Sequence, residues 1–275
     1  MRSKTIKSTL RHLTLSAIGV IALSGVAQAA QCGNTGAGFP AWVQSFKQEA
    51  ASRGISKKAL AALDNVKYAT ATINADRNQK SFKLSLNDFM QKRGSTTIIN
   101  RGKTLKKQNA ALFAKIEQRY GVPAGPLLAI WGMETGFGNY LGKQHTLSAA
   151  ATLAYDCRRS EFFTNELYAA LQLIQRGDLS PNAVGAMHAE IGQTQFLPSS
   201  VLKYGADGDG NGHIDMVGSR ADALASTANF LKAHGWRAGA GYQQGQPNYG
   251  AIQGWNAASV YQQAIAIMGK AIDGN

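Results

Sequence analysis

The sequence predicts a mainly α-helical globular protein, and three observations lead to this prediction. Apolar residues recur three or four positions apart in several segments, which is the spacing of one helix face. Alternation of apolar and polar residues, which would indicate strands, is scarce. The 275 residues are 44% hydrophobic and 16% charged, which is the composition of an ordinary folded chain. This length suits one large domain or two smaller ones.

The helices are expected where an apolar stripe is bounded by a start or stop signal. A serine before the first turn and a glycine after the last turn are the usual signals, and proline is tolerated in the first turn. The clearest stripe, with Phe163, Leu167 and Leu171, runs through residues 160–176. Residues 242–249, rich in Gln, Gly and Pro, are expected to form a surface loop. In chain order, the expected helices are 42–53, 57–63 (capped by Ser56), 108–120, one starting at Pro123 and Pro126, 160–176, 222–234 and 259–272.

Residues 1–30 have the pattern of a secretory signal peptide. Four basic residues precede an uncharged apolar run at 13–26, and residues 27–29 read Ala-Gln-Ala, the small-x-small pattern of a cleavage site. The apolar run is shorter than the roughly 20 residues that span a bilayer. We therefore expect a cleaved signal peptide and a periplasmic mature protein of residues 31–275 without a stable membrane anchor.

Two cysteines, Cys32 and Cys157, are present. An oxidising compartment allows them to pair, which would tie the mature N-terminus to the middle of the chain. Two free thiols are the alternative. The sequence contains no Cys/His cluster of the zinc type.

The chain is strongly basic, with 29 Lys and Arg against 16 Asp and Glu and a formal net charge of +13. The first thirty residues carry four positive and no negative charges, so their removal leaves +9. This charge favours a polyanionic neighbour, which could be nucleic acid, an anionic membrane surface or an acidic cell-wall polymer. The expected export and the lack of a recognition motif argue against nucleic acid.

Glu134 stands out among the few acidic residues, because motifs of metal hydrolases, serine hydrolases and phosphate-binding loops are absent. It lies near the end of an apolar helix, just before two glycines that should stop the helix. The helix dipole and the apolar neighbours Trp131, Met133 and Phe137 disfavour the anion, so the pKa of Glu134 should be raised. A carboxyl that is protonated near neutral pH can act as a general acid. A surface glutamate at a helix end is the alternative.

Two further segments combine amide, hydroxyl and aromatic groups, which hold sugars by hydrogen bonds and ring stacking. One is Glu-Ile-Gly-Gln-Thr-Gln-Phe-Leu-Pro-Ser-Ser at 190–200, which contains Gln195 and Phe196. The other is Gly-Trp-Asn at 254–256, followed by Tyr261. Each is weak evidence alone, because ordinary loops also contain such residues.

Taken in order, these elements resemble the lytic murein transglycosylases of the membrane-bound B type. The resemblance covers nearly all of the chain after residue 30. It rests on Glu-Thr-Gly-Phe-Gly at 134–138, Gly-Gln-Thr-Gln-Phe-Leu-Pro-Ser-Ser at 192–200, an Asp/Gly run at 207–215, Ala-Asn-Phe-Leu-Lys-Ala-His-Gly-Trp at 228–236, and Trp255-Asn256 with Tyr261.

The resemblance implies a lysozyme-like fold of the goose type with substrate bound in a cleft and an additional helical lobe. The lysozyme-like core would cover about residues 105–240, packed with N-terminal and C-terminal helical segments. The expected substrate is the glycan strand of peptidoglycan, the expected reaction leaves a 1,6-anhydro-N-acetylmuramoyl end, and no cofactor is needed for catalysis.

The resemblance also implies roles for single residues. Glu134 would be the one catalytic acid and base, and the substrate would supply its own nucleophile. Gln195, Asn256 and Tyr261 would bind glycan, together with the aromatic residues Phe196 and Trp255.

The sequence departs from the family pattern at a few positions. Thr135 and Gly136 follow the acid where Ser or Thr and a larger residue are usual, and Trp255 replaces a frequent tyrosine. We expect these differences to alter saccharide contacts more than chemistry. Glu190 is a second carboxylate, and facing Glu134 across the cleft it would allow a hydrolase that activates water. The alternative for Glu190 is a structural or solvent-facing role.

The run at 207–215, Asp-Gly-Asp-Gly-Asn-Gly-His-Ile-Asp, predicts an EF-hand-like loop that binds a structural Ca²⁺. Asp207, Asp209 and Asn211 offer side-chain oxygens, and His213 offers its backbone carbonyl. Position 12 of the loop is a glycine, so the resemblance implies Asp222 as the remaining ligand. A turn rich in Asp and Asn without a metal is the alternative.

Three classes of function remain open at this stage. The first is the transglycosylase, the second is a hydrolytic muramidase, and the third is a peptidoglycan-binding protein without catalysis. We expect a monomer, because the sequence has no coiled-coil heptads.

Overall fold

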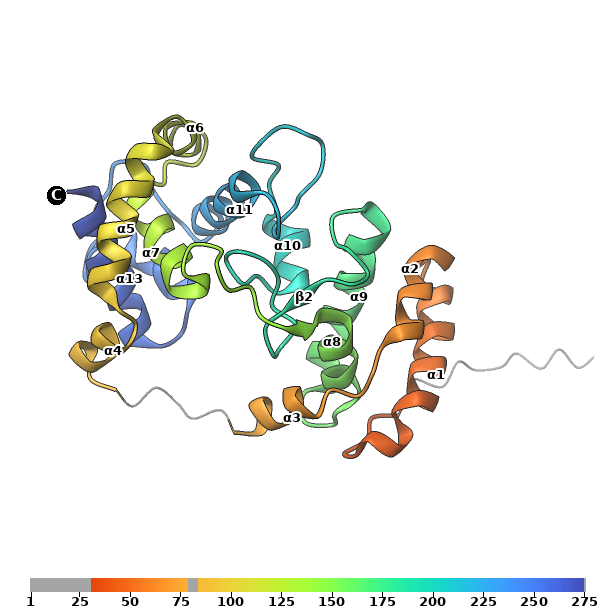
Figure 1. The fold of residues 1–275 in the computed structure, drawn as a ribbon. Coiled ribbons are helices and arrows are strands. Elements are labelled where there is room, and N and C mark those ends of the chain that lie inside the picture. The colour runs from red at the N-terminus through yellow and green to blue at the C-terminus, as the bar shows by residue number, and fades with distance from the viewer. Residues whose placement is uncertain (1–30, 79–83, 275) are drawn as a thin grey trace, which may run out of the picture.

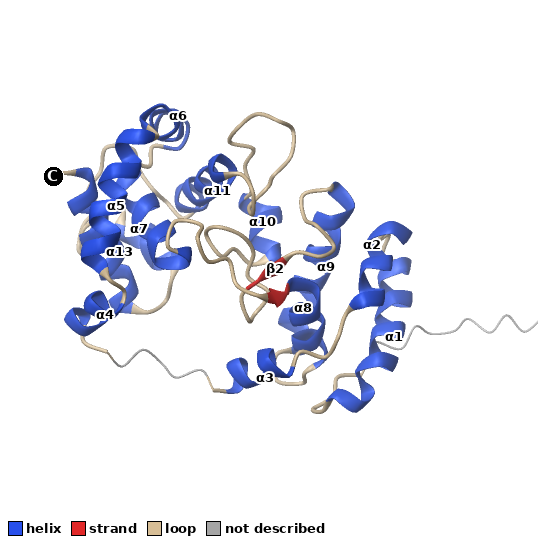
Figure 2. Ribbon diagram, viewed as in Figure 1, coloured by secondary structure: helices blue, strands red, loops and turns tan. Residues whose placement is uncertain are grey.

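The computed structural model describes residues 31–78 and 84–274, so the expected signal peptide lies outside the described residues. The described chain is mainly helical, as predicted (Figures 1 and 2). Strand β1 (Gln144–His145) pairs in antiparallel fashion with β2 (Val184–Gly185). The helices are α1 (Phe39–Ser52), α2 (Lys57–Ala61), α3 (Thr70–Arg77), α4 (Leu86–Lys92), α5 (Ser95–Gln108), α6 (Ala110–Tyr120), α7 (Ala124–Thr135), α8 (Thr146–Tyr155), α9 (Ser160–Arg176), α10 (Pro198–Tyr204), α11 (Arg220–Ala233), α12 (Tyr249–Trp255) and α13 (Ser259–Asp273), with the 3-10 helices η1 (Gly36–Gly38) and η2 (Ala62–Asn65).

The expected helices are present, with ends that shift by a few residues. Helix α9 has the predicted bounds, and the hydroxyl of Ser56 accepts a hydrogen bond from the Ala59 N–H at 3.3 Å, which confirms the predicted cap of α2. The predicted helix 57–63 ends earlier as an α-helix and continues as η2. Helices α3, α4, α5, α8, α10 and α12 were not predicted, and α12 takes the last residue of the expected surface loop.

Two hydrophobic cores lie side by side. Helices α1, α2, α8 and α9 build the first core, and α5, α6, α7, α11 and α13 build most of the second. Figure 1 shows these two groups on opposite sides of the molecule, with α10 between them. The side chains of Phe230 and Trp255 pack against both cores. Because each core draws helices from separate stretches of the chain, the region between the cores is lined by residues far apart in sequence.

Helix α7 forms the centre of the second core. It is apolar on all sides, with Leu127 and Ile130 fully buried, and it packs against α13 and α5. Close approach to α13 requires a small residue, since a Cβ at Gly125 would lie 2.3 Å from the backbone oxygen of Gly269. The packing of α7 against α13 brings the C-terminal part of the chain to the end of α7.

A disulfide between Cys32 and Cys157 connects the segment before α1 with the segment after α8. The backbone supports it, because the Gly33 N–H donates to the Tyr155 carbonyl at 2.9 Å. Of the two alternatives for the cysteines, the structure therefore has the paired one. Within the described part of the chain, every helix is too short or too polar to cross a membrane.

Candidate active site

Glu134 lies in the last turn of α7, which is ended by three successive residues in the left-handed region. The φ angles are 58° at Gly136, 65° at Phe137 and 79° at Gly138. This conformation is strained at a residue other than glycine and persists only where the surroundings hold it. Phe137 is held by burial and by an edge-on contact with Trp131, whose ring centroid is 5.4 Å away. The glycine stop predicted after Glu134 is thus present.

Two side chains from the C-terminal helices donate hydrogen bonds to one oxygen of Glu134. The Tyr261 hydroxyl on α13 lies 2.7 Å from Oε1, and the Trp255 indole Nε1 at the end of α12 lies 3.1 Å from it. The guanidinium of Arg93, just after α4, lies 5.7 Å from the centre of the Tyr261 ring. These contacts join the ends of α7, α12, α13 and α4, and no sequence pattern pointed to Arg93.

The pKa of Glu134 is raised above its ordinary value, as the sequence predicted. Burial is the main cause, and the negative charge of Glu190 acts in the same direction. The hydrogen bonds from Tyr261 and Trp255 and the charge of Arg93 favour the anion and offset part of this rise. The pKa of Tyr261 is also raised by burial and by Glu134, so the phenol remains a neutral donor.

Gln195 and Phe196 belong to a tight loop that precedes α10. Two backbone hydrogen bonds between Ile191 and Phe196, of 2.7 and 3.1 Å, close this loop. Gln195 has a left-handed φ of 55°, and its Nε2 donates to the carbonyls of Gly192 at 2.8 Å and Leu141 at 3.3 Å. Strained backbone of this kind is common at functional sites.

Thr135 connects the end of α7 to this loop. Its hydroxyl donates to the Gln193 carbonyl at 2.6 Å and accepts from the Gly138 N–H at 2.9 Å, and the residue is 2% exposed. Thr135 has the usual side chain at its position, so the departures from the family pattern are Gly136 and Trp255. Their effect on saccharide contacts stays a prediction. Trp255 also contacts the acid itself, so a change there acts directly on Glu134.

A cavity of about 540 Å³ lies where the two cores meet. Its wall contains five of the residues expected at the site, Glu134, Gln195, Phe196, Trp255 and Asn256. The wall is completed by Ser200 and Phe230, which belong to the segments that carry the resemblance, and by Arg159, Phe162, Phe163 and His188, to which no site role was assigned from the sequence. The aromatic rings suit stacking against a sugar, and the polar groups suit hydrogen bonds.

The expected residues Asn256 and Tyr261 differ in their exposure to this cavity. Asn256 is half-buried in the wall, where its Oδ1 accepts from the Ala258 N–H at 2.9 Å. Tyr261 is 3% exposed and its hydroxyl is directed to Glu134. A contact between Tyr261 and glycan stays a prediction, whereas its contact with the acid was missed because 127 residues separate the two in sequence.

Glu190 lies in the wall of the same cavity as Glu134. Burial tends to raise its pKa, but hydrogen bonds from the ring and backbone of His188 outweigh burial and lower the pKa below the ordinary value. The cavity therefore contains one carboxyl that favours its proton and one that favours its charge.

The loop at 207–215, here called the acidic loop, places part of the expected metal-binding set close together in space. Carboxylate oxygens of Asp207, Asp209 and Asp222 lie within 4.8 Å of one another. Asp222 is fully buried at the start of α11, and its two oxygens accept hydrogen bonds from the backbone of 208, 209 and 215. The Asn211 side chain accepts from the backbone N–H of His213 at 2.9 Å.

The site and fold can be compared with known proteins. The membrane-bound lytic murein transglycosylase B of Escherichia coli K12 is 40% identical over 124 residues, which are 44% of this chain and 34% of that protein. The match thus spans about a third of the length of that relative.

Solved structures match over most of the chain. SltB3 from Pseudomonas aeruginosa in complex with NAG-NAM-pentapeptide has a TM-score of 0.81 at 29% identity, covering 86% of this chain and 80% of that chain. Slt35 from E. coli in complex with calcium has a TM-score of 0.76 at 24% identity, covering 89% and 96%, a likeness that concerns the fold alone. The lysozyme-like fold implied by the resemblance is confirmed.

The family itself follows from a domain match. The family model described as the transglycosylase SLT domain matches residues 38–246, which include the end of α7, the loop before α10 and the acidic loop. The chain therefore belongs to the transglycosylase SLT domain family.

Proposed function

We propose that this protein is a lytic transglycosylase that cleaves the β-1,4 bond between N-acetylmuramic acid and N-acetylglucosamine in peptidoglycan. The observation that carries the proposal is the state of Glu134, a carboxyl of raised pKa in the cavity wall with two hydrogen-bond donors on one oxygen. Family membership and the muropeptide complex of the SltB3 structure support the choice of substrate.

In the first step, protonated Glu134 gives its proton to the glycosidic oxygen as the bond from that oxygen to the anomeric carbon of N-acetylmuramic acid breaks. Glu134 is then a carboxylate. The donors Tyr261 and Trp255 stabilise this carboxylate, because each makes a hydrogen bond to Oε1.

In the second step, the C6 hydroxyl of the same sugar attacks the anomeric carbon. Its proton passes to Glu134, which returns to its starting state, and a 1,6-anhydro ring forms. No water is consumed, so one carboxylate suffices where ordinary glycosidases use two. The expected glycan-binding residues Gln195, Phe196, Trp255 and Asn256 line the cavity in which this would take place.

Mass spectrometry of the muropeptides released from purified sacculi tests this proposal. The protein should release anhydromuropeptides, and Glu134→Gln should release none while keeping its circular dichroism spectrum. As a matched control, Glu117→Gln makes the same chemical change at an exposed position outside the cavity and should retain activity.

The same experiment separates the rival functions. A hydrolytic muramidase is favoured by the second carboxylate, Glu190, in the cavity wall, and it would release muropeptides with reducing ends. A binding protein would hold the sacculi and release nothing. Either of these two outcomes would contradict the transglycosylase proposal.

A structural Ca²⁺ in the loop at 207–215 is part of the proposal. The gathered oxygens of Asp207, Asp209 and Asp222 fit a hard cation, since three carboxylates at this spacing repel one another without positive charge. Asn211 and the backbone carbonyl of His213 are the further ligands expected from the sequence. The ion would supply no chemistry to the reaction and would hold the loop against α11.

Export and the cellular setting are also proposed. We infer a signal peptide at residues 1–30 and a periplasmic location without a stable membrane anchor. We also infer that the protein is a monomer and that its lysozyme-like core lies near residues 105–240. N-terminal sequencing of protein from a periplasmic extract should begin close to residue 31, and a chain that still begins at residue 1 would contradict cleavage.

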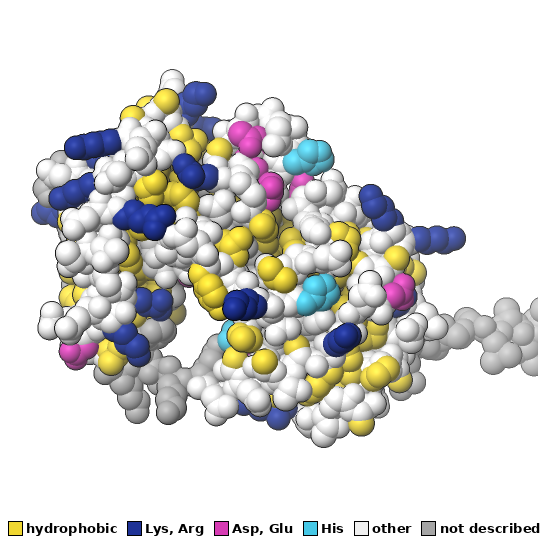
Figure 3. Space-filling view, in the orientation of Figure 1, with side chains coloured by type: hydrophobic (Ala, Val, Ile, Leu, Met, Phe, Trp, Pro, Cys, Tyr) yellow, Lys and Arg dark blue, Asp and Glu magenta, His cyan; other side chains and the backbone are white. Residues whose placement is uncertain are grey.

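The positive charge would draw the mature protein to anionic polymers of the envelope. Figure 3 shows Lys and Arg side chains over the part of the surface where α5 and α6 lie, with fewer acidic side chains on that face. Binding of the Glu134→Gln variant to sacculi should weaken as NaCl rises from 50 to 500 mM, because salt screens exposed charges. An affinity for sacculi that does not change with salt would contradict a role of the exposed charges and would mean that the cavity alone binds the sacculi.

A further inference from the structure

Glu190 has no task in the proposed reaction, although it lies in the wall of the same cavity as Glu134. Its side chain is 25% exposed, so the carboxylate reaches the cavity while most of it is covered by protein. A charge in this position acts on a neighbouring carboxyl through a medium of lower effective dielectric than water.

The backbone around Glu190 fixes where this charge lies. Ala189 has a left-handed φ of 68° and is fully buried, and this turn lets Glu190 Oε2 accept the backbone N–H of His188 at 2.9 Å. The Glu190 carbonyl accepts from the Ala186 N–H at 3.2 Å. Gly185 passes so close that an added Cβ would lie 2.0 Å from the same carbonyl oxygen.

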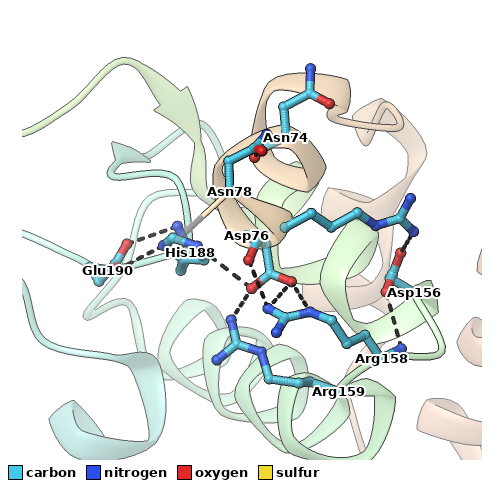
Figure 4. Close-up of polar contacts among 9 residues, drawn as sticks. Asn74, Asp76, Asn78, Asp156, Arg158, Arg159, His188 and Glu190 are labelled. Carbon is cyan, nitrogen blue, oxygen red and sulfur yellow. Dashed lines mark hydrogen bonds and ion pairs between the residues drawn. The ribbon is translucent and has the colours of Figure 1, made fainter. Parts of the chain in front are cut away.

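The His188 ring connects Glu190 to a buried ion-pair cluster. Its Nδ1 lies 3.5 Å from Glu190 Oε1, and its Nε2 lies 3.7 Å from an oxygen of Asp76 on α3. Asp76 is 2% exposed and forms ion pairs with Arg158 and Arg159. Figure 4 shows His188 between the two carboxylates, and His188 and Arg159 contact the same oxygen of Asp76. Burial opposes ionisation of Asp76, but the arginines lower its pKa below the ordinary value.

The charged and titratable groups around Glu134 come from four elements. Arg93 after α4 favours the anion, as do Tyr261 on α13 and Trp255 on α12 through their hydrogen bonds. Glu190 on the loop after β2 opposes the anion.

Arg159 also lines the cavity, where its guanidinium is paired with the Asp76 carboxylate that Arg158 shares. Among the described residues whose charge acts on Glu134, Glu190 supplies the negative charge and Arg93 the positive one.

We propose that Glu190 is a positioning residue, a fixed negative charge in the cavity wall that acts together with burial to keep the proton on Glu134 until the glycan binds. The cluster of His188, Asp76, Arg158 and Arg159 holds this charge in place. This inference rests on the proposed function of Glu134 as the acid.

The contacts of Glu190 favour this role over that of a base that activates water. Both of its oxygens are engaged by His188, one by the backbone N–H and the other by the ring. The carboxylate is therefore held on the wall of the cavity and is not free to turn toward a water molecule at the anomeric carbon.

The test compares pH profiles of kcat/KM on soluble glycan strands for the unchanged protein, Glu190→Gln and the control Glu117→Gln. The alkaline limb reports loss of the proton from Glu134 in the free enzyme. Removing the neighbouring negative charge makes the Glu134 anion easier to form, so this limb should move to lower pH in Glu190→Gln. In Glu117→Gln, which loses an exposed charge outside the cavity, the limb should stay in place.

A titration of the Glu134 carboxyl by ¹³C NMR gives a second readout that needs no turnover. The Glu134 signal, assigned by its loss in Glu134→Gln, should titrate at lower pH in Glu190→Gln than in the unchanged protein. An alkaline limb and a carboxyl titration that both stay in place in Glu190→Gln would overturn the proposal.

The products separate failure of this inference from failure of the proposed function. Anhydromuropeptides from both the unchanged protein and Glu190→Gln are expected. Reducing muropeptides from the unchanged protein that vanish in Glu190→Gln would make Glu190 a catalytic base and overturn the positioning role. Absence of any anhydro product from the unchanged protein would instead refute the transglycosylase.

Discussion

The neighbours of Glu134 act on its proton in opposite directions. Burial and the charge of Glu190 favour the protonated form, whereas Tyr261, Trp255 and Arg93 favour the carboxylate. A residue that must first give and then take a proton needs both states within reach, and a balance of this kind provides them. The raised pKa shows that the surroundings as a whole favour the protonated form of Glu134 more than water does.

Tyr261→Phe tests the support of the carboxylate state. The substitution removes the 2.7 Å hydrogen bond to Oε1, and hydrogen bonds to charged groups contribute about 1.5–3 kcal/mol. We expect kcat to fall roughly ten- to hundredfold. Because this bond lowers the pKa of Glu134, its loss should raise that pKa and move the alkaline limb of kcat/KM to higher pH, opposite to the shift in Glu190→Gln.

Tyr242→Phe is the matched control for this change. The Tyr242 hydroxyl donates to Asp273 on the same helix, α13, at 2.8 Å, but Tyr242 does not line the cavity with Glu134. It should lose stability and keep its kcat. Equal kcat values in Tyr261→Phe and the unchanged protein would contradict a role for the Tyr261 hydroxyl.

The sequence could reveal Glu134 but not its partners. The apolar helix and the glycines that stop it are local, so the position and the raised pKa of Glu134 follow from neighbours in sequence. Trp255 and Tyr261 reach the same carboxyl from positions 121 and 127 residues later, which only the packing of α13 against α7 and of α12 against α13 decides. Their identity as site residues came from the family resemblance, and their contact with the acid came from the structure.

At the scale of elements, the end of α7 and the loop before α10 are joined through one hydroxyl. Thr135→Val keeps the shape of the side chain but leaves the Gln193 carbonyl and the Gly138 N–H without their partner. An unsatisfied buried polar group costs about 1–3 kcal/mol, so the free energy of unfolding should fall by roughly this amount in urea titrations.

Thr104→Val provides the comparison for Thr135→Val. Thr104 is exposed on α5 and bonds only to a carbonyl of its own helix, that of Asn100 at 3.2 Å. Its replacement should change stability by no more than about 0.5 kcal/mol. Similar losses in the two variants would contradict the importance of the link to the loop.

The acidic loop and α11 form a second joined pair of elements, and Ca²⁺ should stabilise them. Addition of 5 mM CaCl₂ to chelator-treated protein should raise its Tm, since a ligand that binds only the folded state shifts the unfolding equilibrium. Asp222→Asn removes one of the three gathered carboxylates and should abolish this rise. The control is Asp88→Asn, which makes the same change at an exposed residue outside the loop and should keep the rise in Tm. No rise in the unchanged protein would favour a turn without metal.

A helix could be predicted from the sequence when one of its faces is buried and the other is exposed. Helix α9 lies on the surface of its core and has an apolar stripe, so its bounds were predictable. All ten residues of α8 are buried, so the segment is apolar or small on every side and shows no stripe. Helix α5 buries only Ile98 and Gly102, too few apolar residues to mark a face. Helices α4, α10 and α12 have seven residues each, which is about two turns.

At the scale of the whole molecule, the site lies between two cores, each built from helices that come from separate stretches of the chain. Phe163 and Phe196 in the cavity wall belong to the first core, and Phe230 and Trp255 pack against both. The acid comes from α7 of the second core. The relative position of the cores therefore sets the distance between the acid and the aromatic wall, and contacts that fix this position matter for the reaction.

The disulfide is one constraint on the whole molecule, because Cys32 and Cys157 are 125 residues apart in sequence. Closing a loop of this length stabilises the folded state by up to about 5 kcal/mol through the entropy of the unfolded chain, and native disulfides typically contribute 2–5 kcal/mol. Replacing both cysteines by serine should therefore lower the Tm by roughly 5–15 °C in differential scanning calorimetry. Both residues are exposed, so the substitutions themselves leave no cavity in a core. Dithiothreitol should lower the Tm of the unchanged protein to that of the double variant and leave the variant as it is. A Tm that does not respond to reductant would mean that the unfolded chain gains little freedom from the loss of this bridge.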